Sequence, residues 1–143
     1  MSAFIDHFRG NFKSALRWHD LDNLWETIRN NNQGQWYAYH VGDEPPSEPI
    51  SVDELETFIT AIDELLHNEH HEDYCGIVYA DDINHPSMVK IFDPHNLGVV
   101  CGYSDNPPLP GWILSTEPPE NLQSAFPPPD NRRRWWQKLF NSM

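Results

Sequence analysis

The sequence predicts an α+β fold in which two helices pack on one face of a four- or five-stranded, mainly antiparallel sheet. Two segments, 11–30 and 51–71, repeat apolar residues at helical spacing. Short runs rich in aromatic and β-branched residues alternate with turn-forming segments, first at 36–41 and then from position 74 onwards. A length of 143 residues suits one domain, and we expect residues 1–117 to form it.

The first predicted helix covers residues 11–30. Asp20 or Asp22 can cap a second start, so we expect either one helix or two short helices with a bend near His19. The run of Asn, Gln and Gly at 30–34 ends the helix, because these residues tolerate the conformation of a helix cap. The expected apolar face consists of Phe12, Ala15, Leu16, Leu24, Trp25 and Ile28.

The second predicted helix begins with a capping box. Ser51 stands three residues before Glu54, and each side chain satisfies a free backbone N–H of the first turn. Ile50 and Leu55 match the hydrophobic staple that accompanies such a start. We expect this helix to end between residues 67 and 71. Its apolar stripe consists of Leu55, Phe58, Ile59, Ile62, Leu65 and Leu66.

The second half of the chain predicts further strands and an arm. The strands are expected at 74–80, 88–92, 99–103 and 111–116. Asp, Pro, Asn and Gly between positions 93 and 98 are turn residues, so 88–103 is predicted to form a hairpin. Residues 118–143 are expected to form a Pro-rich extended arm that ends in a basic, aromatic tail.

The charge is strongly acidic and unevenly distributed. The net charge is −13, yet residues 127–143 hold four Lys or Arg against one Asp, which leaves −16 for residues 1–126. Residues 30–89 contain thirteen Asp and Glu and no Lys or Arg. Such a body repels phosphate, so we do not expect it to bind nucleic acid. Alternatively, the charge serves solubility alone.

The first functional hypothesis is therefore a non-catalytic interaction protein that binds a basic protein. An inhibitor or immunity protein that covers a basic enzyme site is one form of it. The chain has no phosphate-binding glycine loop, serine elbow or dinucleotide fingerprint. The residues expected to contact the partner are Asp53, Glu56, Asp63, Glu64, Asp81 and Asp82.

The second hypothesis is a divalent-metal site at the end of the second helix. Asp63, His67 and His71 are spaced by four residues and would share one helical face. Two imidazoles and a carboxylate suit zinc or nickel, and Cys75 would be near enough to add a soft ligand. The alternative is that these histidines interact only with the helix dipole.

The third hypothesis is a thiol enzyme that uses Cys75 or Cys101. A reactive cysteine needs a neighbouring base to form the thiolate, for which His71 or His95 is available. Both cysteines stand in predicted strands among apolar residues, and a buried cysteine usually serves as a small core residue.

The tail differs from the rest of the chain. A short amphipathic helix is expected there, which would either fold back on the acidic body, touch an anionic membrane weakly, or stack on nucleic acid. Its contact residues are Arg132, Arg133, Arg134, Trp135 and Trp136. No apolar run is long enough for a bilayer and no secretory signal is recognised, so we expect a cytoplasmic protein with reduced thiols.

Overall fold

The computed structural model describes residues 3–94 and 109–126. It confirms the α+β class: within these residues, four helices accompany a five-stranded open sheet in which all paired neighbours are antiparallel. The strand order is β1-β3-β4-β5-β2. The elements are α1 (Ala3–Phe8), β1 (Lys13–Ser14), α2 (Trp18–Asn30), β2 (Tyr37–His40), α3 (Val52–Glu69), β3 (Val78–Ala80), β4 (Met88–Ile91), β5 (Trp112–Ser115) and α4 (Leu122–Ala125).

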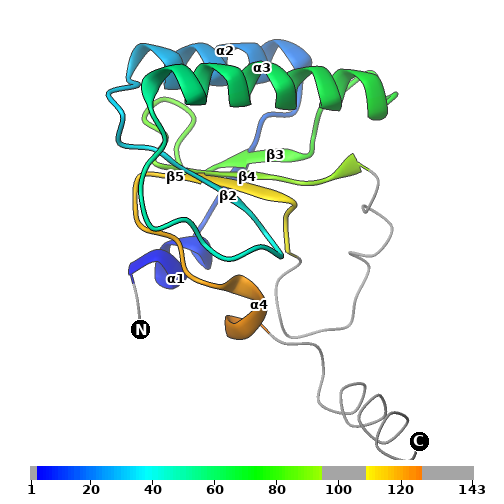
Figure 1. Ribbon diagram of the computed structural model, residues 1–143. Helices are drawn as coiled ribbons and strands as arrows, with labels where there is room; N and C mark the ends of the chain where they lie inside the picture. The colour runs from blue at the N-terminus through cyan, green and yellow to red at the C-terminus, as the bar shows by residue number, and fades with distance from the viewer. Residues whose placement is uncertain (1–2, 95–108, 127–143) are drawn as a thin grey trace, which may run out of the picture.

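The two long helices, α2 and α3, lie side by side on one face of the sheet, as predicted (Figure 1). They bury a mostly aliphatic cluster with the strand residues that point toward them. From α2 come Leu21, Leu24, Trp25 and Ile28; from α3 come Leu55, Ile59, Ile62 and Leu66; and from the sheet come Val78, Ala80, Val89, Ile91 and Leu114. Because strand side chains alternate between faces, only every second residue reaches this cluster.

The opposite face carries the short helices α1 and α4, which were not predicted (Figure 1). Their core is separate and rich in aromatic residues. It consists of Phe4, Ile5, Phe8, Tyr39, Met88, Ile113, Leu122 and Phe126. The backbone N–H of Leu122 donates to the Tyr39 hydroxyl at 3.2 Å. The sheet is therefore covered on both faces, and not on one alone.

The start of α3 confirms the capping box. The Glu54 N–H donates to Ser51 Oγ at 3.1 Å, and the Ser51 N–H donates to Glu54 Oε1 at 3.0 Å. The backbone hydrogen bond lowers the pKa of Glu54, because it favours the ionised carboxylate. Along the predicted stripe, Leu55, Ile62 and Leu66 are buried, whereas Leu65 is half-buried.

The first predicted helix is too long at its start. It begins at Trp18, where the Arg17 N–H donates to the Asp20 carboxylate at 3.0 Å, so Asp20 helps to start the only helix formed there and there is no bend. The preceding residues pair with distant backbone instead. Ala15 donates to the Val78 carbonyl at 2.8 Å and Cys75 donates to the Leu16 carbonyl at 2.7 Å.

One predicted strand is shorter than expected, and another lies outside the described residues. The strand expected at 74–80 is only Val78–Ala80, since Gly76 has a φ of +69° that breaks the extended conformation. The strand expected at 99–103, and with it the hairpin over 88–103, lies outside the described residues. In the part described, β4 pairs with β3 and with β5.

The expected arm begins with packed residues. Pro119, Leu122 and Phe126 are buried, and α4 lies against the sheet. Residues 118–126 therefore pack on the body of the protein. An extended arm stays a prediction for residues 127–143, which fall outside the described ranges together with the predicted tail contacts. No helix among the described residues is long and apolar enough to cross a membrane.

Candidate functional site

An open groove of about 420 Å³ runs between α2 and α3 on the outer surface of the helical layer. We call it the carboxylate groove, because three acidic side chains enter it from both helices. Its lining residues are Asp22, Trp25, Glu26, Arg29, Asn30 and Asp63. Two of the predicted site residues, Asp63 and His67, lie in or beside it.

Asp63 is positioned by the core beneath the groove. Trp25 is buried in the α2–α3 interface, and its Nε1–H donates to Asp63 Oδ1 at 3.0 Å. Indole nitrogens that are buried usually find such a partner. The carboxylate is thereby oriented through one oxygen, and among the described residues no group donates to its second oxygen.

His67 is one helical turn after Asp63. Its Nε2 lies 3.6 Å from Asp63 Oδ1, which is an ion-pair distance when the ring is protonated but is long for a hydrogen bond. The imidazole stacks on the Trp18 ring with centroids 4.2 Å apart. Trp18 is in turn held by its Nε1–H, which donates to the Glu72 carbonyl at 3.1 Å. Two tryptophans therefore orient the Asp63 and His67 side chains.

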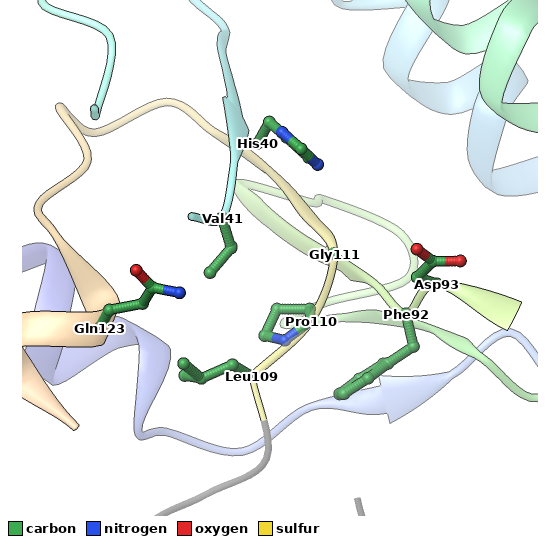
Figure 2. A pocket seen from close by; sticks show the side chains of 8 residues that line it. All are labelled: His40, Val41, Phe92, Asp93, Leu109, Pro110, Gly111 and Gln123. Carbon is green, nitrogen blue, oxygen red and sulfur yellow. The ribbon is translucent and has the colours of Figure 1, made fainter. Parts of the chain in front are cut away.

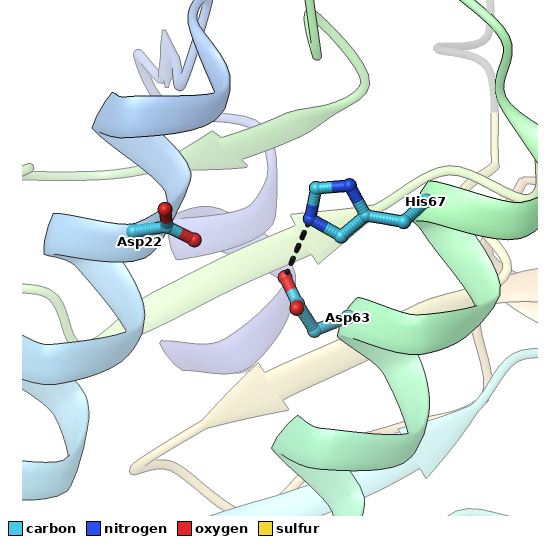
Figure 3. A group of neighbouring side chains, drawn as sticks. All are labelled: Asp22, Asp63 and His67. Carbon is cyan, nitrogen blue, oxygen red and sulfur yellow. Dashed lines mark ion pairs between the residues drawn. The ribbon is translucent and has the colours of Figure 1, made fainter.

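Asp22 completes the cluster from the neighbouring helix. Figure 3 shows its carboxylate directed from α2 toward Asp63 and His67 on α3. One ligand atom from each of the three residues lies within 4.8 Å of the others. One imidazole and two carboxylates can bind a divalent ion and leave positions for water. The same carboxylates can instead accept hydrogen bonds from an ammonium or guanidinium group.

The predicted ligand His71 does not join this cluster. Helix α3 ends at Glu69 and His70 is its C-cap, so the four-residue spacing does not continue to position 71. The His70 Nε2–H donates to the Cys75 carbonyl at 2.8 Å, which binds the end of the helix to the chain that follows. His71 is exposed. Asp22 takes its place, and no local spacing links Asp22 to Asp63.

The residues predicted to contact a partner have different surroundings. Asp53 and Glu64 are exposed on α3. Glu56 pairs with Arg29 of α2 at 3.0 Å, although no basic residue stands near it in sequence. Asp82 is exposed and accepts from the Asn84 and His85 N–H groups.

Asp81 is the exception, because its carboxylate is bonded within the fold. It accepts from the backbone N–H groups of Ser87 and Met88, from the Ser87 hydroxyl and from His7. Although burial raises the pKa of Asp81, these hydrogen bonds outweigh it and lower the pKa overall. Asp81 is thus poorly placed to receive a partner.

Cys75 has the environment of a core residue. It is fully buried, and burial raises the pKa of its thiol, which disfavours the thiolate that a nucleophile requires. His71 is exposed beyond the end of α3, and Cys101 and His95 fall outside the described residues.

A second, smaller hollow of about 220 Å³ lies where β2 and β4 end and β5 begins, on the side of α4. Figure 2 shows Val41, Leu109 and Pro110 between the polar groups of His40, Asp93 and Gln123. His40 Nδ1 lies 2.9 Å from Asp43 Oδ2, but both side chains are largely exposed. Solvent weakens such a pair, so the carboxylate groove is the better-organised candidate.

Comparisons of the chain with models of known protein families, with curated proteins and with solved structures give no match.

Proposed function

We propose that the protein binds a basic protein partner, and that the carboxylate groove receives a Lys or Arg side chain of that partner. The observation that carries this proposal is the convergence of Asp22 and Asp63 from two different helices. In the described part of the chain, neither carboxylate has an ion pair with Lys or Arg.

Convergent carboxylates that have no ion pair with Lys or Arg repel each other, and this lowers the stability of the free protein. Arg29 also lines the groove, but its Nε pairs with Glu56 at 3.0 Å. A guanidinium that enters between them replaces the repulsion by charge-assisted hydrogen bonds, to which planar arginine is well suited. Asp63 is already oriented by Trp25 at 3.0 Å. Less side-chain entropy is therefore lost on binding than for two freely rotating carboxylates.

The surface around the groove supports an electrostatically steered association. Asp53 and Glu64 are exposed on the same helix, and the chain has a net charge of −13. A field of this sign attracts a basic surface and repels nucleic acid. An inhibitor or immunity protein that covers a basic enzyme site remains one form of the proposal. The cytoplasm is the proposed location, where both cysteines stay reduced.

The test uses a fluorescent hexa-arginine peptide as a probe of the groove. We expect Asp22→Asn combined with Asp63→Asn to weaken peptide binding by about tenfold or more, since charged pairs contribute most where they are partly desolvated. The matched control is Glu44→Gln combined with Glu48→Gln. It removes the same charge from exposed residues of the β2–α3 loop.

Anisotropy titrations at low and physiological salt provide the measurement. Equal weakening by the two double variants would mean that only total charge matters, and the acidity would then serve solubility. If the peptide binds in the groove, the control should lose less than about twofold at physiological salt, where distant charges are screened.

The second candidate function is divalent-metal binding at Asp22, Asp63 and His67. The specific observation in its favour is that three ligand atoms lie within 4.8 Å of one another, with His67 stacked on Trp18. A mixed imidazole and carboxylate set suits zinc or nickel better than calcium, which takes oxygen ligands.

Calorimetry with zinc and with nickel separates this candidate from the first. We expect His67→Ala and Asp22→Asn to abolish binding, whereas His71→Ala, the matched histidine outside the cluster, leaves it unchanged. Loss of metal binding in His71→Ala would show that the ligands are Asp63, His67 and His71, as predicted from the sequence. Identical titrations for wild type and His67→Ala would end the metal proposal and leave the peptide proposal untouched.

A further inference from the structure

His7 of α1 lies between two carboxylates on the face of the sheet opposite the carboxylate groove. Its Nδ1 is 2.7 Å from Glu117 Oε1, and its Nε2 is 2.7 Å from Asp81 Oδ2. Asp81 follows β3 and Glu117 follows β5, so the imidazole joins three segments that are far apart in the sequence. All three side chains are partly shielded from water, with exposed fractions of 22, 15 and 32% for His7, Asp81 and Glu117.

This arrangement requires a particular protonation state. A neutral imidazole has one N–H and one lone pair, so it can donate to only one of two carboxylates. The imidazolium donates from both nitrogens and satisfies both contacts. Burial lowers the pKa of His7, but hydrogen bonds to Glu117 and Asp81 and their charges outweigh burial, so the pKa is raised overall.

The two carboxylates are not held equally. Asp81 also accepts from the N–H groups of Ser87 and Met88 and from the Ser87 hydroxyl. Glu117 Oε2 is buried and has no hydrogen-bond partner among the residues described. When His7 loses one proton, a single N–H remains for two carboxylates, so one of the two contacts loses its donor. Asp81 keeps its other donors, whereas nothing else described holds the carboxylate of Glu117.

We propose that His7, Asp81 and Glu117 form a pH-dependent latch. The latch holds α1 and the β5–α4 connection on the sheet while both ring nitrogens carry a proton, and it loses one of its two carboxylate contacts when one proton is lost. It lies apart from the carboxylate groove and does not rest on the proposed function. Two positive charges on this side contact aromatic rings: Arg9, which follows α1 and whose guanidinium carbon is 5.8 Å from the centroid of the Phe126 ring, and Lys90 of β4. Its Nζ lies 3.9 Å from the centroid of the Phe12 ring, which in turn neighbours His7.

The direction of the pH effect follows from the raised pKa of His7. The stabilisation is fully present below the unfolded-state pKa of 6.5 and is lost as the pH rises through the higher folded-state value. The loss of one carboxylate contact should therefore occur as the pH rises above 6.5. It should affect α1 and residues 116–122 before the α2–α3 layer.

Glu117→Gln is the decisive variant, because an amide can donate an N–H to the lone pair of a neutral imidazole. With glutamine, both contacts of His7 are satisfied without the second proton, so the latch stays closed at alkaline pH. The matched control is Glu120→Gln. It removes the same charge from a nearby exposed residue that has no described side-chain contact.

Nitrogen-15 spectra of the histidine rings give the protonation state directly. At about pH 6 we expect both His7 nitrogens of the wild type to be protonated. Between about pH 6 and 9, amide protection in α1 and residues 116–122, corrected for intrinsic exchange, should fall about threefold or more in wild type and in Glu120→Gln. In Glu117→Gln it should change less, and His7 should titrate at a lower pH.

Two results would overturn the latch. One is a wild-type His7 with a single protonated nitrogen at about pH 6, which needs no variant to measure. The other is a Glu117→Gln protein in which His7 titrates at the same pH as in wild type. Since Lys90 is present in every protein compared, its own titration cannot produce the difference.

Discussion

On one face of the sheet, α2 and α3 bury a large aliphatic cluster, whereas on the other α1 and α4 cover a smaller cluster rich in phenylalanine. The first pair of helices has 13 and 18 residues, and the second pair has six and four. Helices of six or four residues are not stable alone in water. They depend on tertiary contacts, and here those contacts include polar ones.

The polar contacts on the two faces of the sheet also have different roles. On the long-helix side, hydrogen bonds cap a helix and orient a side chain. The Ser51 hydroxyl caps the start of α3, and the Trp25 indole orients the Asp63 carboxylate. On the short-helix side, His7 joins segments that would otherwise touch mainly through apolar side chains. We infer that the first face responds to packing changes and the second responds to protonation. The following experiments test that difference.

The largest effect is expected in the α2–α3 core. Leu66 is fully buried, whereas its neighbour Leu65 is half-buried. We expect Leu66→Ala to lower the free energy of unfolding by about 2–5 kcal/mol and Leu65→Ala by about 1 kcal/mol or less. The helix propensity changes equally in both variants, so the difference measures burial. Similar losses in urea denaturation would mean that the outer side of α3 is also covered.

An intermediate effect is expected at Lys90 on the α1–α4 face. Burial lowers the pKa of Lys90 to about 8, while the rings of Phe8 and Phe12, with centroids 4.1 and 3.9 Å from Nζ, favour the charged form and offset part of that cost. Because the folded pKa lies below the unfolded value of 10.5, the unfolded chain binds more protons between them. This contribution to stability therefore rises with pH across that window.

Lys90→Met keeps most of the length of the side chain and removes the charge. After allowance for solvent screening, we expect it to raise the free energy of unfolding by about 1 kcal/mol at neutral pH. The gain should shrink as the pH approaches 10.5, the unfolded value of lysine. Urea denaturation at neutral and alkaline pH measures both quantities. A gain that does not depend on pH would show that packing, and not the charge, is responsible.

The smallest effect is expected at the ion pair on the outer surface of the helical layer. Arg29 Nε lies 3.0 Å from Glu56 Oε2, and both side chains are well exposed. We expect Glu56→Gln to cost about 0.2–1 kcal/mol at low salt and nothing measurable in about 1 M salt. Glu64→Gln, which has no described partner, is the control and should cost nothing. A loss in Glu56→Gln that survives high salt would contradict a screened surface pair.

Much of the long-helix face was predictable because its signals are local. The capping box of Ser51 and Glu54 lies within four residues, and the stripe of α3 repeats from Leu55 to Leu66, over about three turns of helix. The strands at 88–92 and 111–116 were predicted within one residue at each end. Their order in the sheet was not predicted, since pairing depends on residues far apart in the chain.

The candidate site was predictable only in part, for the same reason. Asp63 and His67 share one helix and their spacing places them together, but Asp22 joins them only because α2 packs beside α3. His71 has the right spacing and still lies outside the cluster, because the helix ends first. A helical pattern extrapolated past the last hydrogen-bonded turn no longer predicts a shared face.

By itself, the sequence determined the α+β class, the extent of α3, and the acidic body, since periodicity, capping and charge are properties of neighbouring residues. Tertiary structure alone decided that residues 13–16 pair with the chain around β3, that α1 and α4 cover the second face, and that His7 lies between Asp81 and Glu117. The physical reason is the separation along the chain: His7 is 74 residues from Asp81 and 110 from Glu117. Contacts of that range leave no local pattern, and they form only when the whole sheet has brought the three segments together.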